Sequence, residues 1–186
     1  HIITAAKLEQ DISYAEKDKE LMKEAGFNVE DFDIEGRTCR QLVNFLMAFD
    51  IIFVQGGNAF YLLKQMRLSG FGKAMKKLFK KGIIYVGVSA GSVVAGKSIK
   101  TAEWLGDYNN DLEYANKKLV DDLTGVNFVP LDIFVHYGPE YAEIIKKQPN
   151  YNKKNLAILI DEQSLLVVGK EISLIGAGQA INVDKL

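Results

Sequence analysis

The sequence has few of the residues that stabilise secreted or zinc-binding proteins. Its 186 residues include one cysteine, two histidines and three prolines. The single cysteine, Cys39, excludes an internal disulfide, and no second cysteine or nearby histidine completes a zinc site. No hydrophobic run approaches the roughly 18 residues that a membrane-spanning helix needs, and no signal-peptide pattern opens the chain. We therefore expect a soluble protein of the reducing cytoplasm.

An excess of one charge is also missing. The chain has 23 basic and 24 acidic side chains, which gives a net charge of −1. Such a chain has no general field that attracts nucleic acid or anionic lipid, so either partner would need a local basic patch. The one candidate is residues 73–81, where lysines surround apolar positions as on a solvated helix face. We expect no nucleic-acid and no membrane partner.

Short apolar runs alternate with helical patterns along the chain. The runs at residues 51–54 and 83–86 are continuous and are bounded by glycines, which is typical of parallel strands covered on both faces. Helical spacing covers residues 8–25, 59–69 and 71–81, and a shorter helix contains Leu42 and Leu46. The alternation predicts an α/β fold, a doubly wound and mostly parallel sheet between two helical layers. With no linker or repeat, residues 1–186 are expected to form a single domain.

Other segments give weaker signals. Strands are predicted at residues 27–34 and 128–135, and Pro139 is expected in the first turn of a helix. Three short strands are predicted between Leu156 and Ile175, and a turn at Gly169 makes the last two a C-terminal β-hairpin. The chain opens with what looks like the end of a strand, so we expect further residues before His1.

The strongest chemical signal is Gly87-Val88-Ser89-Ala90-Gly91, directly after an apolar strand and before a helical run. A serine flanked by glycines at a strand-to-helix turn is the nucleophile-elbow arrangement, in which the tight turn exposes the hydroxyl. The helix N-terminus and its N–H groups then face a developing oxyanion. The pattern indicates Ser89 as a nucleophile, although a serine that merely caps a helix would give the same letters.

A serine nucleophile needs a base, and histidine is the side chain best suited to that role near neutral pH. His1 opens the chain, whereas His136 follows an apolar run and lies at the predicted mouth of a strand. His136 is therefore the candidate base. A third group should orient its imidazole, and the segment between Ser89 and His136 offers several carboxylates. We favour Asp107, which lies in a predicted loop, over Glu103; each is also compatible with a solvated loop charge.

A second glycine cluster, Gln55-Gly56-Gly57-Asn58, follows the other buried strand. In a parallel sheet it would lie beside the elbow, where glycine lets a backbone N–H approach a substrate carbonyl. We predict Gly57 and Ala90 as oxyanion-hole donors and Asn58 as a substrate-binding residue. The same letters also suit a plain turn followed by a helix cap.

Together these motifs resemble the peptidase E (alpha-aspartyl dipeptidase) and cyanophycinase family of serine peptidases. The matching segments are Ile2 to Ala6, Val54 to Leu63, Gly82 to Tyr85, Gly87 to Ser92, Phe134 to Tyr137 and Asp161 to Gly169. They span essentially the whole chain, and the family's first strand would precede His1. The chain departs from the family's usual residues at three positions: Ala59 stands in place of threonine, Ser92 in place of alanine and Val135 in place of proline.

The resemblance implies a fold similar to class I glutamine amidotransferases, a flavodoxin-like sheet, with the triad in the order serine, acid, histidine. It further implies hydrolysis of dipeptides or short peptides through an acyl-enzyme, without metal or cofactor, and with a preference for an N-terminal aspartyl residue. The implied partner is the short peptide substrate. The sequence is also compatible with a homodimer.

Three other functions share parts of the pattern. An α/β-hydrolase esterase has the elbow, but its histidine usually lies near the C-terminus of a larger sheet. A cysteine-dependent amidotransferase needs cysteine where Ser89 stands, and Cys39 lies at a predicted helix start. A non-catalytic peptide-binding module could keep the fold without turnover. The distance from Ser89 Oγ to a His136 ring nitrogen separates the serine peptidase from this binding module, because the enzyme needs it within about 3 to 4 Å.

Overall fold

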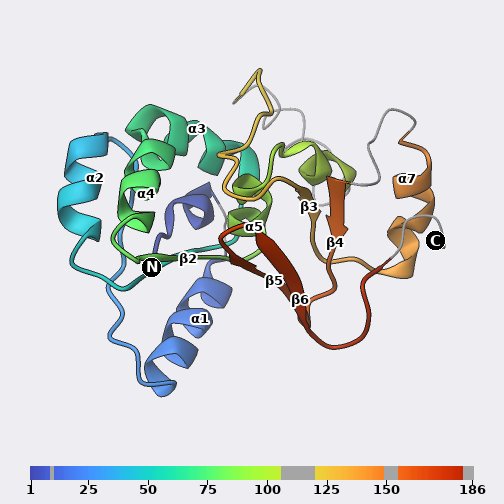
Figure 1. Ribbon diagram of the computed structural model, residues 1–186, viewed down its shortest axis with the longest axis horizontal. Helices are drawn as coiled ribbons and strands as arrows, with labels where there is room; N and C mark the ends of the chain where they lie inside the picture. The colour runs from blue at the N-terminus through green and yellow to red at the C-terminus, as the bar shows by residue number, and fades with distance from the viewer. Residues whose placement is uncertain (9–10, 106–119, 149–154, 182–186) are drawn as a thin grey trace.

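The computed structural model describes residues 1–8, 11–105, 120–148 and 155–181 (Figure 1). Within them, strand pairing is of two kinds. The parallel pairs are β1 (Ile51–Val54) with β2 (Ile84–Gly87), and β3 (Asp132–Phe134) with β4 (Leu156–Ile158). The antiparallel pair is β5 (Gln163–Val168) with β6 (Glu171–Gly176). The C-terminal hairpin is thus present, with Gly169 at positive φ in its turn.

The N-terminal segment adds to the edge of β1. Ile2 N–H donates to Phe53 O at 2.7 Å, and Ile2 also forms a parallel bridge with Phe32 on its other side. The parallel neighbours therefore lie side by side in the order of the segment around Phe32, the segment around Ile2, β1 and β2. Their carboxyl ends lie at one edge, which is where sites form in α/β sheets.

Helices cover these strands. They are η1 (Thr4–Leu8), α1 (Ser13–Glu24), α2 (Cys39–Leu46), α3 (Ala59–Ser69), α4 (Phe71–Phe79), α5 (Ala90–Ala95), η2 (Lys100–Leu105), η3 (Pro139–Tyr141) and α7 (Ala142–Lys146). In Figure 1, α2, α3 and α4 gather on one side of β1 and β2, and α1 lies on the other. Local chemistry fixes several ends: Thr38 forms a capping box on α2, and Gly70 ends α3 in the left-handed conformation.

The main core lies between β1, β2 and the helices α2 to α5. Ile52 and Val54 of β1 are fully covered there, together with Leu62 of α3 and Met75 of α4. A smaller cluster of Trp104, Phe134, Ile145 and Ile158 supports β3 and β4. Apolar burial of this kind contributes about 25 cal/mol per Å², so both strand pairs that carry candidate site residues rest on packed side chains.

Two N-terminal predictions are wrong in extent. The predicted helix 8–25 begins only at Ser13, where the Asp11 carboxylate accepts the Ser13 N–H at 2.8 Å and forms a turn before the helix. The predicted strand 27–34 reduces to the single bridge at Phe32. Directly after it, the Glu35 N–H turns back to the Asp33 carboxylate at 3.0 Å instead of extending the ladder.

The predicted strand 128–135 shortens to β3, which begins at Asp132. Its first part is held by the end of α5 instead of by a strand. Phe128 and Val129 both donate their N–H groups to Ala95 O, at 2.9 and 3.1 Å. Backbone groups already paired with a helix terminus cannot pair with a strand, so the apolar run Phe128 to Leu131 packs as a loop.

The α/β class with parallel strands is confirmed, and Pro139 does open a helical turn. The doubly wound, flavodoxin-like layering stays a prediction, because the strands fall into three separate pairs in the part of the chain that the structure describes. In that same part, no helix has the length and apolar character needed to cross a membrane.

Candidate active site

Ser89 lies on a sharp turn between β2 and α5. Its φ of 50° is positive, which is uncommon for a residue other than glycine and marks a strained backbone. The flanking glycines allow this turn to pack tightly. A Cβ on Gly87 would lie 2.5 Å from Gly91 O, and a Cβ on Gly91 would lie 2.2 Å from Val54 O. The glycines are therefore required by close backbone contact, and the predicted elbow is present.

Two side-chain hydroxyls tie the elbow together. Tyr85 Oη donates to Gly91 O at 2.6 Å, and Ser92 Oγ donates to Gly87 O at 2.6 Å. Burial raises the pKa of the Tyr85 phenol well above its ordinary value, so the hydroxyl keeps its proton and remains a donor. Ser92, which departs from the family's usual alanine, thus has a structural role at the turn.

His136 joins Ser89 to a carboxylate. Its Nε2 lies 2.8 Å from Ser89 Oγ, and its Nδ1 lies 2.7 Å from Asp161 Oδ1. His136 also adopts positive φ, at 57°. Its side chain is 48% exposed and that of Asp161 is 71% exposed, so these two groups lie open to solvent, while Ser89 is half-buried. The predicted pairing of Ser89 with His136 is present in the structure.

The carboxylate on His136 is not one that the sequence analysis considered. Asp107, the expected acid, lies outside the described residues, and the alternative, Glu103, lies in η2. The expected carboxylates lie between Ser89 and His136 in the chain, whereas Asp161 follows both. The missed signal was strand pairing: β3 and β4 run parallel, His136 follows β3 and Asp161 follows β4. Carboxyl ends of parallel neighbours meet at the same sheet edge, so both side chains arrive together.

The glycine cluster after β1 lies against the elbow, as predicted. β1 and β2 are parallel with Val54 opposite Gly87, which places the following loops side by side. A Cβ on Gly56 would lie 3.0 Å from Ser89 Cβ. Gly57 has φ of +125°, and its N–H, like that of Ala90 at the start of α5, donates to no backbone carbonyl of the described residues. Both groups remain candidate oxyanion donors.

Asn58 has a visible structural role. Its Oδ1 accepts the Tyr61 N–H at 2.9 Å and caps α3, which satisfies one of the helix's free donors. The capping alternative therefore accounts for the asparagine oxygen. That Asn58 also contacts substrate stays a prediction.

Comparison with known protein families identifies the family of this chain. The model described as peptidase family S51 matches residues 1–175. The chain belongs to peptidase family S51. The resemblance drawn from the elbow and glycine motifs is thereby confirmed, and this S51 chain is a member of a family of peptidases.

Relatives of this S51 chain agree. It is 32% identical to peptidase E of Escherichia coli over 138 residues, which is 73% of this chain and 52% of that protein. It is 25% identical to an uncharacterized peptidase of Listeria monocytogenes, over 92% of this chain and 82% of the relative. Among solved structures, a putative peptidase E from Listeria monocytogenes superposes with a TM-score of 0.77 at 24% identity, covering 95% of this chain and 84% of the other. That likeness supports the fold.

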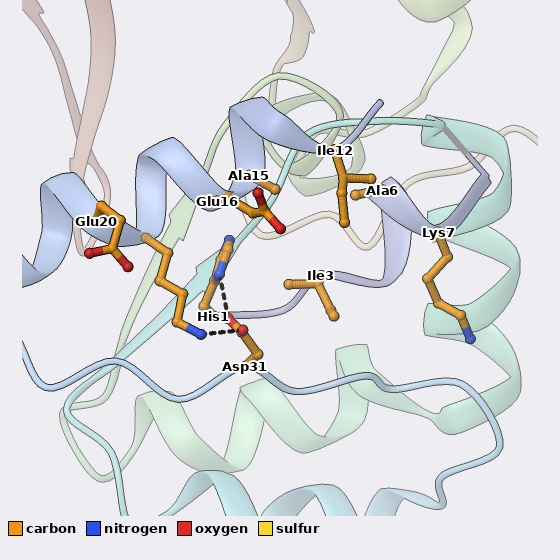
Figure 2. Close-up of a pocket in the computed structure, with 10 residues that line it drawn as sticks. His1, Ile3, Ala6, Lys7, Ile12, Ala15, Glu16, Glu20 and Asp31 are labelled. Atoms are coloured by element: carbon orange, nitrogen blue, oxygen red, sulfur yellow. Dashed lines mark hydrogen bonds and ion pairs between the residues drawn. The ribbon is translucent and has the colours of Figure 1, made fainter. Parts of the chain in front are cut away.

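The S51 chain also contains a cavity of about 440 Å³ away from the serine. It lies between α1 and the N-terminal segment (Figure 2). Ile3, Ala6 and Ala15 give it an apolar lining, and His1 and Asp31 lie at its polar side. Its lining includes neither Ser89 nor His136, so it is not the place where a bond could be cleaved by these groups.

Proposed function

We propose that this S51 family member is a serine peptidase that hydrolyses dipeptides or other short peptides through an acyl-enzyme on Ser89. One observation carries the proposal: an unbroken hydrogen-bonded line from Ser89 Oγ through the His136 imidazole to the Asp161 carboxylate, with contacts of 2.8 and 2.7 Å. Nucleophile, base and orienting acid in contact are the requirements for activating a serine. The same distance disfavours the non-catalytic binding module, which does not need this contact.

The proton positions follow from the acceptors. The Asp161 carboxylate only accepts hydrogen bonds, so His136 carries its proton on Nδ1 and presents the Nε2 lone pair to the serine hydroxyl. Ser89 Oγ attacks the substrate carbonyl carbon while its proton passes to His136 Nε2. The imidazolium that forms is stabilised by Asp161. The N–H groups of Gly57 and Ala90 are the proposed donors to the carbonyl oxygen as it gains negative charge.

The intermediate then breaks down. The C–N bond cleaves, His136 returns the proton from Nε2 to the leaving amine, and the acyl group stays on Ser89 Oγ. A water molecule then removes the acyl group in the same way. His136 takes a proton from the water, the water oxygen attacks the acyl carbon, and His136 returns the proton to Ser89 Oγ as the acid product leaves. Besides water, the scheme uses only groups of this chain. In this scheme the triad order along the chain is serine, histidine, acid, in place of the serine, acid, histidine order expected from the resemblance.

The proposed activity and its substrate preference are tested by measuring hydrolysis of a panel of Asp-X, Glu-X and Ala-X dipeptides and aminoacyl p-nitroanilides. The purified protein is compared with its Ser89→Ala variant. We expect turnover by the wild type alone, and the resemblance favours the Asp-X members. Equal rates on Asp-X and Ala-X would reject the aspartyl preference and leave the peptidase proposal standing. A folded wild type that cleaves none of the panel would contradict the proposed function and favour the binding module.

We predict that Asp161→Asn lowers kcat about 10²- to 10³-fold. Asparagine has nearly the same shape but cannot hold the Nδ1–H tautomer or stabilise the imidazolium as a carboxylate does. The effect should fall below that of a buried triad acid because Asp161 is largely exposed.

The neighbouring carboxylate provides a matched control. Glu162 is exposed, and its backbone carbonyl accepts the Ala177 N–H at 3.0 Å whatever its side chain. Glu162→Gln should therefore leave kcat within about twofold of the wild type. If Glu162→Gln caused the large loss and Asp161→Asn did not, the assignment of the acid would be wrong.

A further inference from the structure

Gln55 is a buried polar side chain beside the candidate oxyanion hole. Gln55 is only 1% exposed, and it directly precedes Gly56 and Gly57. A buried amide is costly unless both of its ends are hydrogen-bonded. Gln55 Nε2 donates to Asp18 Oδ2 at 2.9 Å, and Gln55 Oε1 lies 2.9 Å from His1 Nε2. Its side chain is therefore held from two directions.

The orientation of the Gln55 amide is determined by these partners. The Asp18 carboxylate accepts hydrogen bonds only, so the amide nitrogen faces it and the amide oxygen faces His1. His1 Nε2 must then carry a proton. Its Nδ1 lies 2.9 Å from Asp31 Oδ1, a second acceptor. Both ring nitrogens of His1 therefore face oxygen atoms that can accept a hydrogen bond, Gln55 Oε1 and Asp31 Oδ1.

His1 is itself held in place within the same network. The His1 side chain is 1% exposed, and its ring packs edge-on against Phe53. Burial acts to raise the pKa of the Asp31 carboxyl, but hydrogen bonds from Lys19 and His1 outweigh it and hold that pKa below its ordinary value. Asp31 is thus ionised at neutral pH and is an acceptor for the His1 ring. Figure 2 shows His1 and Asp31 joined at the side of the cavity.

The glycines that follow Gln55 have no side chains with which to fix their own orientation. Gly57 is confined on one side by η1, since a Cβ on it would lie 2.5 Å from Ala5 O. Beyond the pair, Asn58 is anchored by its cap on α3. Before the pair, the anchor is Gln55, linked through Asp18 to α1, whose Tyr14 Oη also lies 3.5 Å from Gly56 O. The turn therefore lies between two side-chain anchors, which add to the backbone hydrogen bonds from Gln55 N–H to Ile2 O and from Asn58 N–H to Ala5 O, at 3.0 and 3.2 Å.

We propose that Gln55, clamped by Asp18 and His1, is a positioning residue that sets the orientation of the Gly56–Gly57 turn and hence of the Gly57 N–H towards the reacting carbonyl. This inference rests on the proposed function. It couples α1 to the site through Asp18, without contact between Asp18 and the reacting atoms. Donors must be pre-oriented to stabilise a transition state, so a loosened anchor should affect turnover more than substrate binding.

The test compares Asp18→Ala with Asp18→Asn. Alanine suits the interior of α1 but removes the acceptor for Gln55 Nε2, whereas asparagine keeps a side-chain oxygen there. We expect Asp18→Ala to lower kcat about tenfold with KM within about twofold, a smaller loss than removal of an oxyanion donor. Asp18→Asn should restore kcat to within about twofold of the wild type. Lys17→Ala, an exposed change on the same helix, is the control and should behave as the wild type.

A second readout does not depend on activity. In ¹H–¹⁵N spectra, the Gly56 and Gly57 amide peaks should move in Asp18→Ala and stay in place in Asp18→Asn and Lys17→Ala. Unmoved glycine peaks, or equal kcat in the alanine and asparagine variants, would overturn the positioning role. If the wild type proved inactive on every peptide, the proposed function would fail, while the glycine peaks would still decide whether the clamp orients the turn.

Discussion

Ser89→Ala is expected to abolish peptide hydrolysis, with a loss in kcat of about 10⁴-fold or more. Without Oγ there is no nucleophile, and the contact of 2.8 Å to His136 Nε2 disappears. The residual rate would come from the oxyanion donors and substrate positioning alone. The loss should appear in kcat with little change in KM, because the hydroxyl is used chiefly in the transition state.

This result is measured by steady-state kinetics on the best substrate of the dipeptide panel, with circular dichroism to show that the variant is folded. Ser92→Ala is a suitable control, since it removes a nearby hydroxyl that bonds Gly87 O and installs the alanine that is usual in the family at this position. We expect it to retain most activity. A Ser89→Ala variant with more than about a tenth of wild-type kcat would contradict the assignment of the nucleophile, because triad serines contribute far more than that.

Gly91→Ala is expected to be the most damaging single change for the fold around the site. The added Cβ would lie 2.2 Å from Val54 O and 3.2 Å from Val54 Cγ1. Val54 is fully buried in β1, so the strand and α5 would have to separate. Overpacking of a closed core costs about 1 to 3 kcal/mol, and contact with fixed backbone places this case at the upper end or beyond. Activity should be lost as well, because the elbow is displaced.

The matched control is Gly72→Ala in α4. There the new Cβ would meet Val126 Cγ1 at 3.7 Å, an ordinary van der Waals contact. Alanine is favoured over glycine within a helix by about 0.5 to 1 kcal/mol, so this variant should be as stable as the wild type or more so. The measurement is the free energy of unfolding from urea titrations. If both variants had the same stability, the close approach of α5 to β1 would not constrain the elbow.

The parts of the site that the sequence predicted are those fixed by local pattern. Ser89 was found because an elbow requires small neighbours next to an apolar strand, and His136 because an elbow serine needs a base. The juxtaposition of the Gln55–Asn58 loop with the elbow also followed, since two continuous apolar runs indicated adjacent parallel strands. In these cases the evidence for a contact is contained in a few consecutive residues.

The parts that were missed depend on long-range pairing. Asp161 reaches His136 because β4 is parallel to β3. Each of these strands has only three residues, and the sequence of such a short strand does not indicate which other strand it pairs with. The Gln55 clamp joins residues that are 37 and 54 positions apart, and a glutamine before a glycine pair has no distinctive spacing. The predicted strand 128–135 shortened because α5 competes for its backbone donors. Such outcomes are decided by which distant segment offers the better contact.

Covalent trapping tests most directly whether His136 activates Ser89. The protein would be treated with a fluorophosphonate probe, and the modified residue located by mass spectrometry, in the wild type and in His136→Asn. Asparagine tolerates the positive φ of 57° at this position. We predict one adduct per chain, on Ser89, and almost none in His136→Asn. A folded wild type that is not labelled, an adduct on another residue, or equal labelling of both proteins would contradict it.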